Sequence, residues 1–150
     1  MLAVDLSDGA LRLTRENAHR LGVSGRLLAM KADATMPPPG GVGPFDIIVS
    51  NPPYITRSEM AQLDHSVADF EPHEALYGGV DGLDYYRRMI PLWSGRLKPG
   101  GMLAAEIGMG QESDVMQMFE ECGMRAQYKK DLCGVIRVIY GIKDGGNHNG

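Results

Sequence analysis

The four residues Asn51-Pro52-Pro53-Tyr54 have the types and the spacing that could carry chemistry in this chain of 150 residues. Residues 45–49, just before them, form a short apolar run rich in β-branched side chains, which predicts a strand buried on both faces. The two prolines cannot donate to a ladder, and each favours extended geometry in the residue before it. We therefore expect Asn51 to be held at the carboxyl end of a strand, where open α/β sheets bind ligands.

A side-chain amide in this place offers both donors and an acceptor, so Asn51 could face a planar nitrogen group of similar shape. The alternative is an ordinary turn at the end of a strand, since Asn and Pro are both common turn residues. The buried strand before Asn51 and the apolar Ile55 after Tyr54 favour the ligand site.

Composition narrows the classes of protein. Hydrophobic residues make up 43% and charged residues 23%, which is ordinary for one globular domain with a proper core. The net charge of −4 argues against a surface that holds nucleic acid by neutralising phosphates, and no apolar run reaches membrane-spanning length. Cys122 and Cys133 lack metal-ligand spacing and the histidines are scattered. We therefore predict no metal site, reduced thiols and a cytoplasmic location, with no membrane and no nucleic acid bound directly.

Two predicted strands precede this motif. Residues 2–4 form a short apolar strand ending at Asp5, and Ser7 suits the N-cap of a helix that Gly22 terminates. Residues 27–32 form the next strand, ending at Asp33. An acidic residue at such a strand end is where nucleotide-type folds bind ribose hydroxyls. For Asp5 the alternative is a favourable interaction with the helix macrodipole.

The elements after the motif alternate between helix and strand. We predict a short helix over 56–63 under a loop that continues to about residue 81, and a helix over 81–97 that Pro91 kinks or splits. A turn at 98–101 leads to a strand at 102–106, a helix at 112–122 and an antiparallel pair at 125–129 and 135–140. This order predicts an α/β sheet with helices on both faces and a closing hairpin. Residues 144–150 form a polar, glycine-rich tail that we expect to be disordered.

Several motifs occur in the order typical of one enzyme family. They are Val4–Ser7, Phe45–Ile55, Phe70–Leu76, Gly79–Leu83, Leu97–Gly101, and Asp131-Leu132 followed by Gly134 and Arg137-Val138. By these motifs residues 2–143 resemble the catalytic domain of the HemK/PrmC family, which methylates the glutamine of the Gly-Gly-Gln loop in peptide chain release factors. The resemblance implies the class I S-adenosylmethionine-dependent methyltransferase fold, which is Rossmann-like, and one catalytic domain over residues 1–143. It also implies a release factor as the protein partner, and a role in translation termination.

The resemblance assigns the catalytic and substrate-binding roles to the residues Asn51-Pro52-Pro53-Tyr54. The Asn51 side-chain oxygen and the Pro52 carbonyl would accept the N–H groups of the substrate amide. This arrangement would aim its nitrogen at the methyl group. Tyr54 would stack on the amide plane, and Pro53 would complete the substrate site.

The resemblance places the cofactor on the two strands before the motif. Asp5 would hold the ribose hydroxyls of S-adenosylmethionine, Asp33 and Ala34 would lie at its adenine, and Asn51 would face its methyl group. Relatives often have tryptophan at the position of Ala34. A solvated carboxylate is the alternative for Asp33. Glu71 and His73 would either order the substrate loop or cap local turns.

The chain also departs from the family pattern. The glycine-rich turn that opens the family's nucleotide site, and the family's N-terminal helical domain, are not in this sequence. We therefore expect a fragment in which a central strand is missing between the strands that end at Asp5 and Ser50. Two alternatives stay open: a methyltransferase of the same fold acting on an exocyclic nitrogen of a nucleobase, and an inactive remnant that only binds a partner. Oligomeric state is not predicted.

Overall fold

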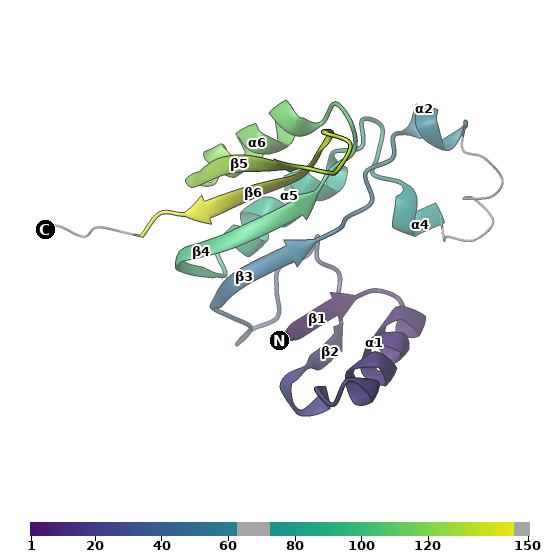
Figure 1. Cartoon of the computed structure of the whole chain (residues 1–150), viewed down its shortest axis with the longest axis vertical. Helices are drawn as coiled ribbons and strands as arrows, with labels where there is room; N and C mark the ends of the chain where they lie inside the picture. The colour runs from purple at the N-terminus through teal and green to yellow at the C-terminus, as the bar shows by residue number, and fades with distance from the viewer. Residues whose placement is uncertain (63–72, 146–150) are drawn as a thin grey trace, which may run out of the picture. The chain divides into compact units, whose positions relative to one another are not determined.

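The computed structural model describes residues 1–62 and 73–145. The chain divides into two compact units, Met1–Gly40 and Gly41–Gly150, so the predicted domain over residues 1–143 contains both. Figure 1 shows the elements of each unit. The last strand ends at Lys143, and of the tail predicted to be disordered, 144–150, only residues 144 and 145 are described, with Asp144 paired to Arg125 at 3.3 Å.

The first unit is a β-α-β arrangement. Its strands β1 (Leu2–Asp5) and β2 (Leu28–Lys31) pair in parallel, and α1 (Asp8–Arg20) packs on both. A short 3-10 helix, η1 (Ser24–Arg26), leads into β2. The two strands and the helix between them lie where the sequence predicted them.

The ends of α1 follow from local chemistry. The Ser7 hydroxyl accepts a hydrogen bond from the Ala10 N–H at 3.2 Å, which satisfies one of the free donors of the first turn. Gly22 then ends the helix with a φ of 67°, in the left-handed region. Leu11 and Ala18 are the buried residues of α1, whereas Leu21, which has the spacing of the same stripe, is the C-cap residue and is 75% exposed.

The second unit is built on a four-stranded mixed sheet with the order β3-β4-β6-β5. Strands β3 (Phe45–Ser50) and β4 (Leu97–Glu106) are parallel, and β6 (Ile136–Lys143) pairs antiparallel with both β4 and β5 (Met124–Lys130). The predicted closing hairpin is confirmed. The α/β class is also confirmed, although β1 and β2 form a separate two-stranded sheet.

Two helices cover one face of the four-stranded sheet. Helix α5 (Asp84–Ser94) packs on β4, α6 (Glu112–Glu121) packs on β5 and β6, and the two helices touch each other. The core lies between these helices and the sheet. Its fully buried side chains include Tyr86, Met89, Ile90, Leu103, Ile107, Val115, Phe119 and Ile139.

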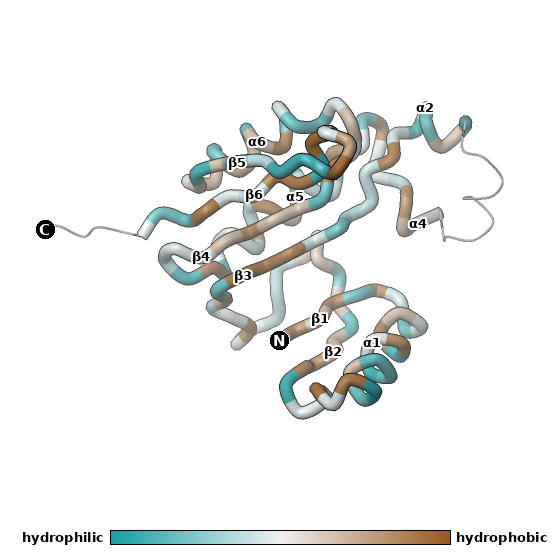
Figure 2. Tube along the Cα trace, in the orientation of Figure 1, coloured by the Kyte–Doolittle hydropathy of each residue, from teal (hydrophilic) through white to brown (hydrophobic). Residues whose placement is uncertain are grey.

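The prediction that β3 is buried on both faces was wrong for one face. Ile47 and Val49 are 60% and 74% exposed, although β3 is an apolar strand (Figure 2). Among the described residues β3 pairs only with β4, and Ile47 and Val49 align with Met102 and Ala104 on the face opposite the buried Leu103. The side chains of β3 therefore lack the second covered face that buried parallel strands have.

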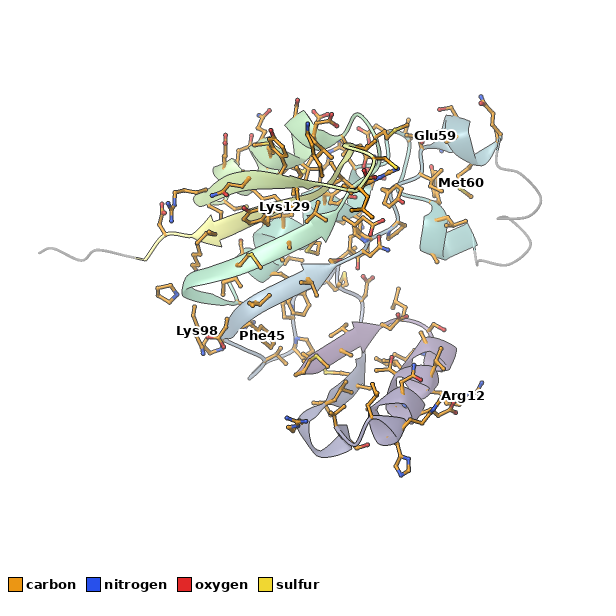
Figure 3. All side chains as sticks on the ribbon, in the orientation of Figure 1. Arg12, Phe45, Glu59, Met60, Lys98 and Lys129 are labelled. Atoms are coloured by element: carbon orange, nitrogen blue, oxygen red, sulfur yellow. The ribbon has the colours of Figure 1, made fainter. Side chains whose placement is uncertain are left out.

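Helix α5 and strand β4 differ from the sequence prediction at their junction. Of the two effects predicted for Pro91, a kink or a split, the split does not occur, because Pro91 lies inside α5, which continues to Ser94; the kink stays a prediction. Leu97 already belongs to β4 and pairs with Phe45, and the predicted turn at 98–101 is a bulge in that strand. The start of β3 is fixed there: Phe45 stacks at a tilt on Trp93, and Lys98 pairs with Asp46 at 2.7 Å (Figure 3).

Two short helices follow β3. Helix α2 (Arg57–Met60) is shorter than the predicted span of 56–63, and α4 (His73–Leu76) begins after the undescribed residues. Thr56 and Glu59 form a reciprocal capping box at the start of α2. Within the described ranges, no helix is long and apolar enough to span a membrane.

Candidate active site

Asn51–Tyr54 follow directly after the end of β3, as predicted. Pro52 is buried and Pro53 is half-buried, so the two rings anchor the segment in the protein. The Asn51 side chain is exposed, and in the described part of the chain its amide has no hydrogen-bond partner. A stiff segment therefore presents an unsatisfied amide at the carboxyl end of a strand.

Backbone hydrogen bonds hold the residues just after Tyr54. The Ile55 N–H donates to the Leu76 carbonyl at 2.9 Å, and the Gly78 N–H donates to the Ile55 carbonyl at 2.9 Å. Ile55 and Tyr77 form the corresponding parallel bridge. The segment that carries Asn51 is thus hydrogen-bonded to a second segment, residues 76–78, more than 20 residues later in the chain.

Glycines allow this second segment to approach the Tyr54 backbone. A Cβ atom at Gly78 would lie 2.7 Å from both the Pro53 oxygen and the Tyr54 Cα, a separation that real side chains do not show. Gly82 has a φ of 77°, and a Cβ there would overlap the Tyr54 carbonyl. The sequence singled out Gly79–Leu83 only as a family motif; the structure gives the motif a physical reason, which is close backbone contact.

Gln111 is a site residue that the sequence reasoning missed. Its side chain is buried and bonds three backbone groups, those of Tyr54, Gly82 and Gly108. One feature of the sequence could have indicated Gln111. It follows Gly108-Met109-Gly110 and occupies the N-cap of α6, where Ser, Thr, Asp or Asn is usual.

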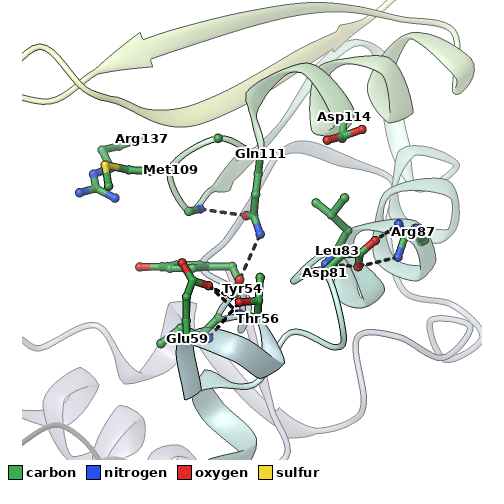
Figure 4. Close-up of a pocket in the computed structure, with 13 residues that line it drawn as sticks. Tyr54, Thr56, Glu59, Asp81, Leu83, Arg87, Met109, Gln111, Asp114 and Arg137 are labelled. Carbon is green, nitrogen blue, oxygen red and sulfur yellow. Dashed lines mark hydrogen bonds and ion pairs between the residues drawn. The ribbon is translucent and has the colours of Figure 1, made fainter. Parts of the chain in front are cut away.

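A pocket of about 540 Å³ opens beside Tyr54. Its size is within the range of small-ligand sites. Figure 4 shows how its walls come from α2, the start of α5, the loop after β4, and β6. Its lining residues are Tyr54, Ile55, Thr56, Glu59, Asp81, Leu83, Arg87, Gly108, Met109, Gly110, Gln111, Asp114 and Arg137.

The charged groups of the pocket are mostly engaged with one another. The Arg87 guanidinium donates to Asp81, and this bond lowers the pKa of the Asp81 carboxyl from 3.8 to about 2. Bonds from the Thr56 hydroxyl and N–H lower the pKa of Glu59. Arg137 pairs with Asp131 at 3.3 Å. These carboxylates are therefore charged at neutral pH, and both guanidinium groups are neutralised.

Tyr86 is a fully buried core residue whose hydroxyl bonds the end of β4. Its hydroxyl donates to the Glu106 carbonyl at 2.7 Å, at the end of β4. Burial raises the pKa of Tyr86 well above its ordinary value, and the nearby Glu106 carboxylate adds to this effect. The phenol is therefore neutral and acts as a fixed donor.

The predicted cofactor residues Asp5, Asp33 and Ala34 lie in the first unit. Because β1 and β2 are parallel neighbours, with Asp5 opposite Lys31, these residues share the carboxyl edge of the two-stranded sheet. Asp5 Oδ1 accepts from the Ser7 N–H at 2.7 Å. Asp33 Oδ1 accepts from both the N–H and the hydroxyl of Thr35. One oxygen of each carboxylate thus has a local partner, and the cofactor roles stay predictions.

Two further predictions concern the undescribed loop and metals. Glu71 lies outside the described residues, and His73 begins α4 with a side chain that the structure does not describe. Residues 1–62 and 73–145 contain no group of three or more His, Cys, Asp or Glu side chains that could hold a metal ion.

Known proteins resemble this chain over most of its length. The release factor glutamine methyltransferase of Rhodospirillum rubrum is 42% identical over 139 residues, which cover 92% of this chain and 42% of that protein. The enzyme of the same name from Clostridium acetobutylicum is 37% identical over 146 residues, covering 97% of this chain and 51% of that protein. The chain is thus similar, over most of its own length, to proteins named release factor glutamine methyltransferase. It spans about half the length of these relatives.

Two further comparisons agree on the kind of fold. The family model described as RMKL-like, methyltransferase domain, matches residues 1–66. The crystal structure of a methyltransferase from Pyrococcus furiosus superposes with a TM-score of 0.64 over 95% of this chain and 62% of that one, at 17% identity. The class I methyltransferase fold predicted from the sequence is confirmed.

Proposed function

We propose that the protein carrying this chain transfers a methyl group from S-adenosylmethionine to the side-chain amide nitrogen of a glutamine in peptide chain release factors. The acceptor is the glutamine of their Gly-Gly-Gln motif. The observation that carries the proposal is the exposed Asn51 amide, without a partner among the described residues, at the carboxyl end of β3. The names of the relatives support the choice of substrate.

The acceptor nitrogen is a weak nucleophile because its lone pair is delocalised, so positioning contributes most of the rate enhancement. The Asn51 side-chain oxygen and the Pro52 carbonyl accept its two N–H groups and stabilise the positive charge that develops on it. Tyr54 stacks on the amide plane, and Pro53 closes the side of the site. The bound cofactor would supply the methyl group with its sulfur as the leaving group, and the methylated nitrogen would release one proton to solvent.

The chain offers suitable groups for the cofactor at the edge of β1 and β2. S-Adenosylmethionine supplies an activated methyl group when bound. One Asp5 oxygen is held by the Ser7 N–H, which leaves the other free to accept a ribose hydroxyl. Asp33 and Ala34 follow the neighbouring strand β2 and take the adenine end.

The proposal includes a protein substrate and a cytoplasmic setting, in translation termination. The pocket beside Tyr54 provides space for the peptide around the acceptor glutamine. Cys122 and Cys133 are both free thiols, as is usual in a reducing compartment. With a net charge of −4, the chain does not favour a direct nucleic-acid partner.

A methyl-transfer assay with radiolabelled S-adenosylmethionine tests this function. Release factor, release factor with the motif glutamine replaced by alanine, transfer RNA and DNA are offered side by side. We expect label only in the intact release factor, with the methyl group on the glutamine. Labelling of nucleic acid alone would identify a nucleobase methyltransferase and contradict the proposal. Absence of S-adenosylmethionine binding at millimolar concentration would favour a binding-only protein.

A further inference from the structure

Gln111 uses its whole side-chain amide to join three separate loops. Its Nε2 donates to the Tyr54 carbonyl at 3.0 Å and to the Gly82 carbonyl at 3.2 Å, and its Oε1 accepts from the Gly108 N–H at 3.0 Å. Figure 4 shows the side chain reaching from the start of α6 toward the Tyr54 backbone. Only 8% of the residue is exposed, so water does not compete effectively for these bonds.

The position of Gln111 is not explained by the needs of its own helix. It occupies the N-cap of α6, yet its side chain makes no capping bond to the helix. It turns instead to groups that are 57, 29 and 3 residues earlier in the chain. An ordinary cap residue would satisfy the first turn of α6. The glutamine at this position therefore serves the loops around Tyr54.

The bonds of Gln111 complete a set of restraints on the segment Asn51–Ile55. Pro52 and Pro53 fix two φ angles at one end, and the Ile55 backbone is bonded to residues 76 and 78 at the other. The Tyr54 carbonyl lies between these restraints. The Ile55 N–H of the same peptide donates to the Leu76 carbonyl, so the bond from Gln111 is the second restraint on the peptide plane that follows Tyr54.

We infer that Gln111 is a positioning residue for methyl transfer, acting through the Tyr54 backbone on Asn51 and Tyr54. This inference rests on the proposed function. It assigns no contact between Gln111 and the reacting atoms. A misplacement of about 1 Å in such a site can cost about 10²-fold in rate, so loss of one of the two bonds on this peptide is expected to lower turnover.

Two variants separate positioning from simple stabilisation. Gln111→Glu keeps an oxygen for the Gly108 N–H and places a carboxylate at a helix N-terminus, which is favourable, but it loses both donors to Tyr54 and Gly82. Gln111→Met keeps the length and loses all three bonds. If Gln111 only anchors the loop after β4, the Glu variant stays active. If Gln111 positions Tyr54, both variants are slow.

We expect kcat to fall about 10- to 100-fold in both variants, with the KM for release factor and the Kd for S-adenosylmethionine changed by less than about threefold. Gln117→Met is the matched control, because Gln117 lies on the exposed face of α6 and bonds only Glu121 among the described residues. Its kcat should equal that of the parent. All rates are measured below the melting temperature of each variant.

Amide hydrogen exchange provides a readout that does not depend on activity. Exchange at Ile55 and Gly78 should accelerate in Gln111→Glu and Gln111→Met, and exchange at Ile139 in the core should not. If the parent methylates no release factor, the proposed function fails. The exchange pattern still tests whether Gln111 holds the backbone around Tyr54. A kcat within threefold of the parent in the Glu variant, together with unchanged exchange at Ile55 and Gly78, would overturn the inference.

Discussion

Asp5 is a carboxylate with one structural contact in the protein and one proposed role in cofactor binding. One of its oxygens holds the Ser7 N–H at the start of α1, and the other has no hydrogen bond to the described residues. Position alone favours a ribose contact, because Asp5 ends a strand beside β2. These two contacts can be tested separately. Loss of the bond to the Ser7 N–H should affect stability, and loss of the ribose contact should affect cofactor affinity.

Replacing Asp5 tests the second role. Asp5→Ala should weaken S-adenosylmethionine binding about tenfold or more, because a hydrogen bond to a charged group contributes about 1.5–3 kcal/mol. Asp5→Asn keeps an acceptor and should weaken it less. Calorimetric titration measures both. If the parent and both variants bind the cofactor equally while only their melting temperatures differ, Asp5 is no more than a helix-start residue.

Asp81 gives a prediction about pH. Its folded pKa is about 2 and its ordinary value is 3.8, so the ion pair with Arg87 stabilises the protein above pH 4 and loses this effect as pH falls toward 2. Both side chains are about half exposed, so the contribution is about 0.2–1 kcal/mol. Urea unfolding should show Asp81→Asn less stable than the parent at neutral pH, with the gap narrowing in acid. A gap that widens in acid would contradict this assignment.

The sequence placed candidate residues where local rules apply and missed those that depend on long-range contacts. Asn51 and Asp5 lie at the ends of apolar strands, as predicted, while their roles in binding stay predictions. Gln111 was not found, because its role depends on the carbonyl of Tyr54, 57 residues earlier. No periodicity or spacing rule relates these two positions.

At the scale of elements, the Tyr86 hydroxyl fastens α5 to the end of β4. Tyr86→Phe should lower the free energy of unfolding by about 1–3 kcal/mol, because the Glu106 carbonyl loses its buried donor while packing is kept. Tyr128→Phe is the matched control, since Tyr128 is 49% exposed, and it should change stability by less than about 0.5 kcal/mol. Chemical denaturation measures both. Equal stability of the two variants would mean that the hydroxyl bond contributes nothing.

The boundaries of the elements were predicted less well than their existence. Leu83, Tyr86, Ile90, Trp93 and Leu97, spaced along the predicted helix 81–97, are all buried, but Leu97 belongs to β4 rather than to the helix. Pro91 does not split α5, because the buried residues Ile90 and Trp93 hold the turns on both sides of it. Tertiary packing therefore overrides the local preference of proline, as it often does.

At the scale of the whole molecule, strand pairing was the least predictable feature. Apolar patterning placed β3 in a sheet, but it could not state how many neighbours the strand has. In the described chain, β3 has one paired edge and an exposed apolar face that includes Ile47 and Val49. Such edges and faces promote association between copies.

Val49→Lys tests this consequence. A charge on the exposed face of β3 should reduce self-association of the 150-residue chain, because edge lysines oppose strand pairing. Leu132→Lys is the control, since Leu132 is a fully exposed apolar residue in the turn between β5 and β6. Light scattering against concentration measures the effect. Equal association of the parent and Val49→Lys would show that the exposed face of β3 does not mediate self-association.

The kinetics of Asn51→Ala in the protein carrying this chain test the central claim most directly. The bonds of Asn51 to the acceptor amide strengthen as charge develops in the transition state, so their loss should lower kcat rather than cofactor affinity. We predict a decrease in kcat of about 10²–10³-fold, with the Kd for S-adenosylmethionine unchanged within about threefold. Turnover within about threefold of the parent would show that Asn51 does not carry the transfer.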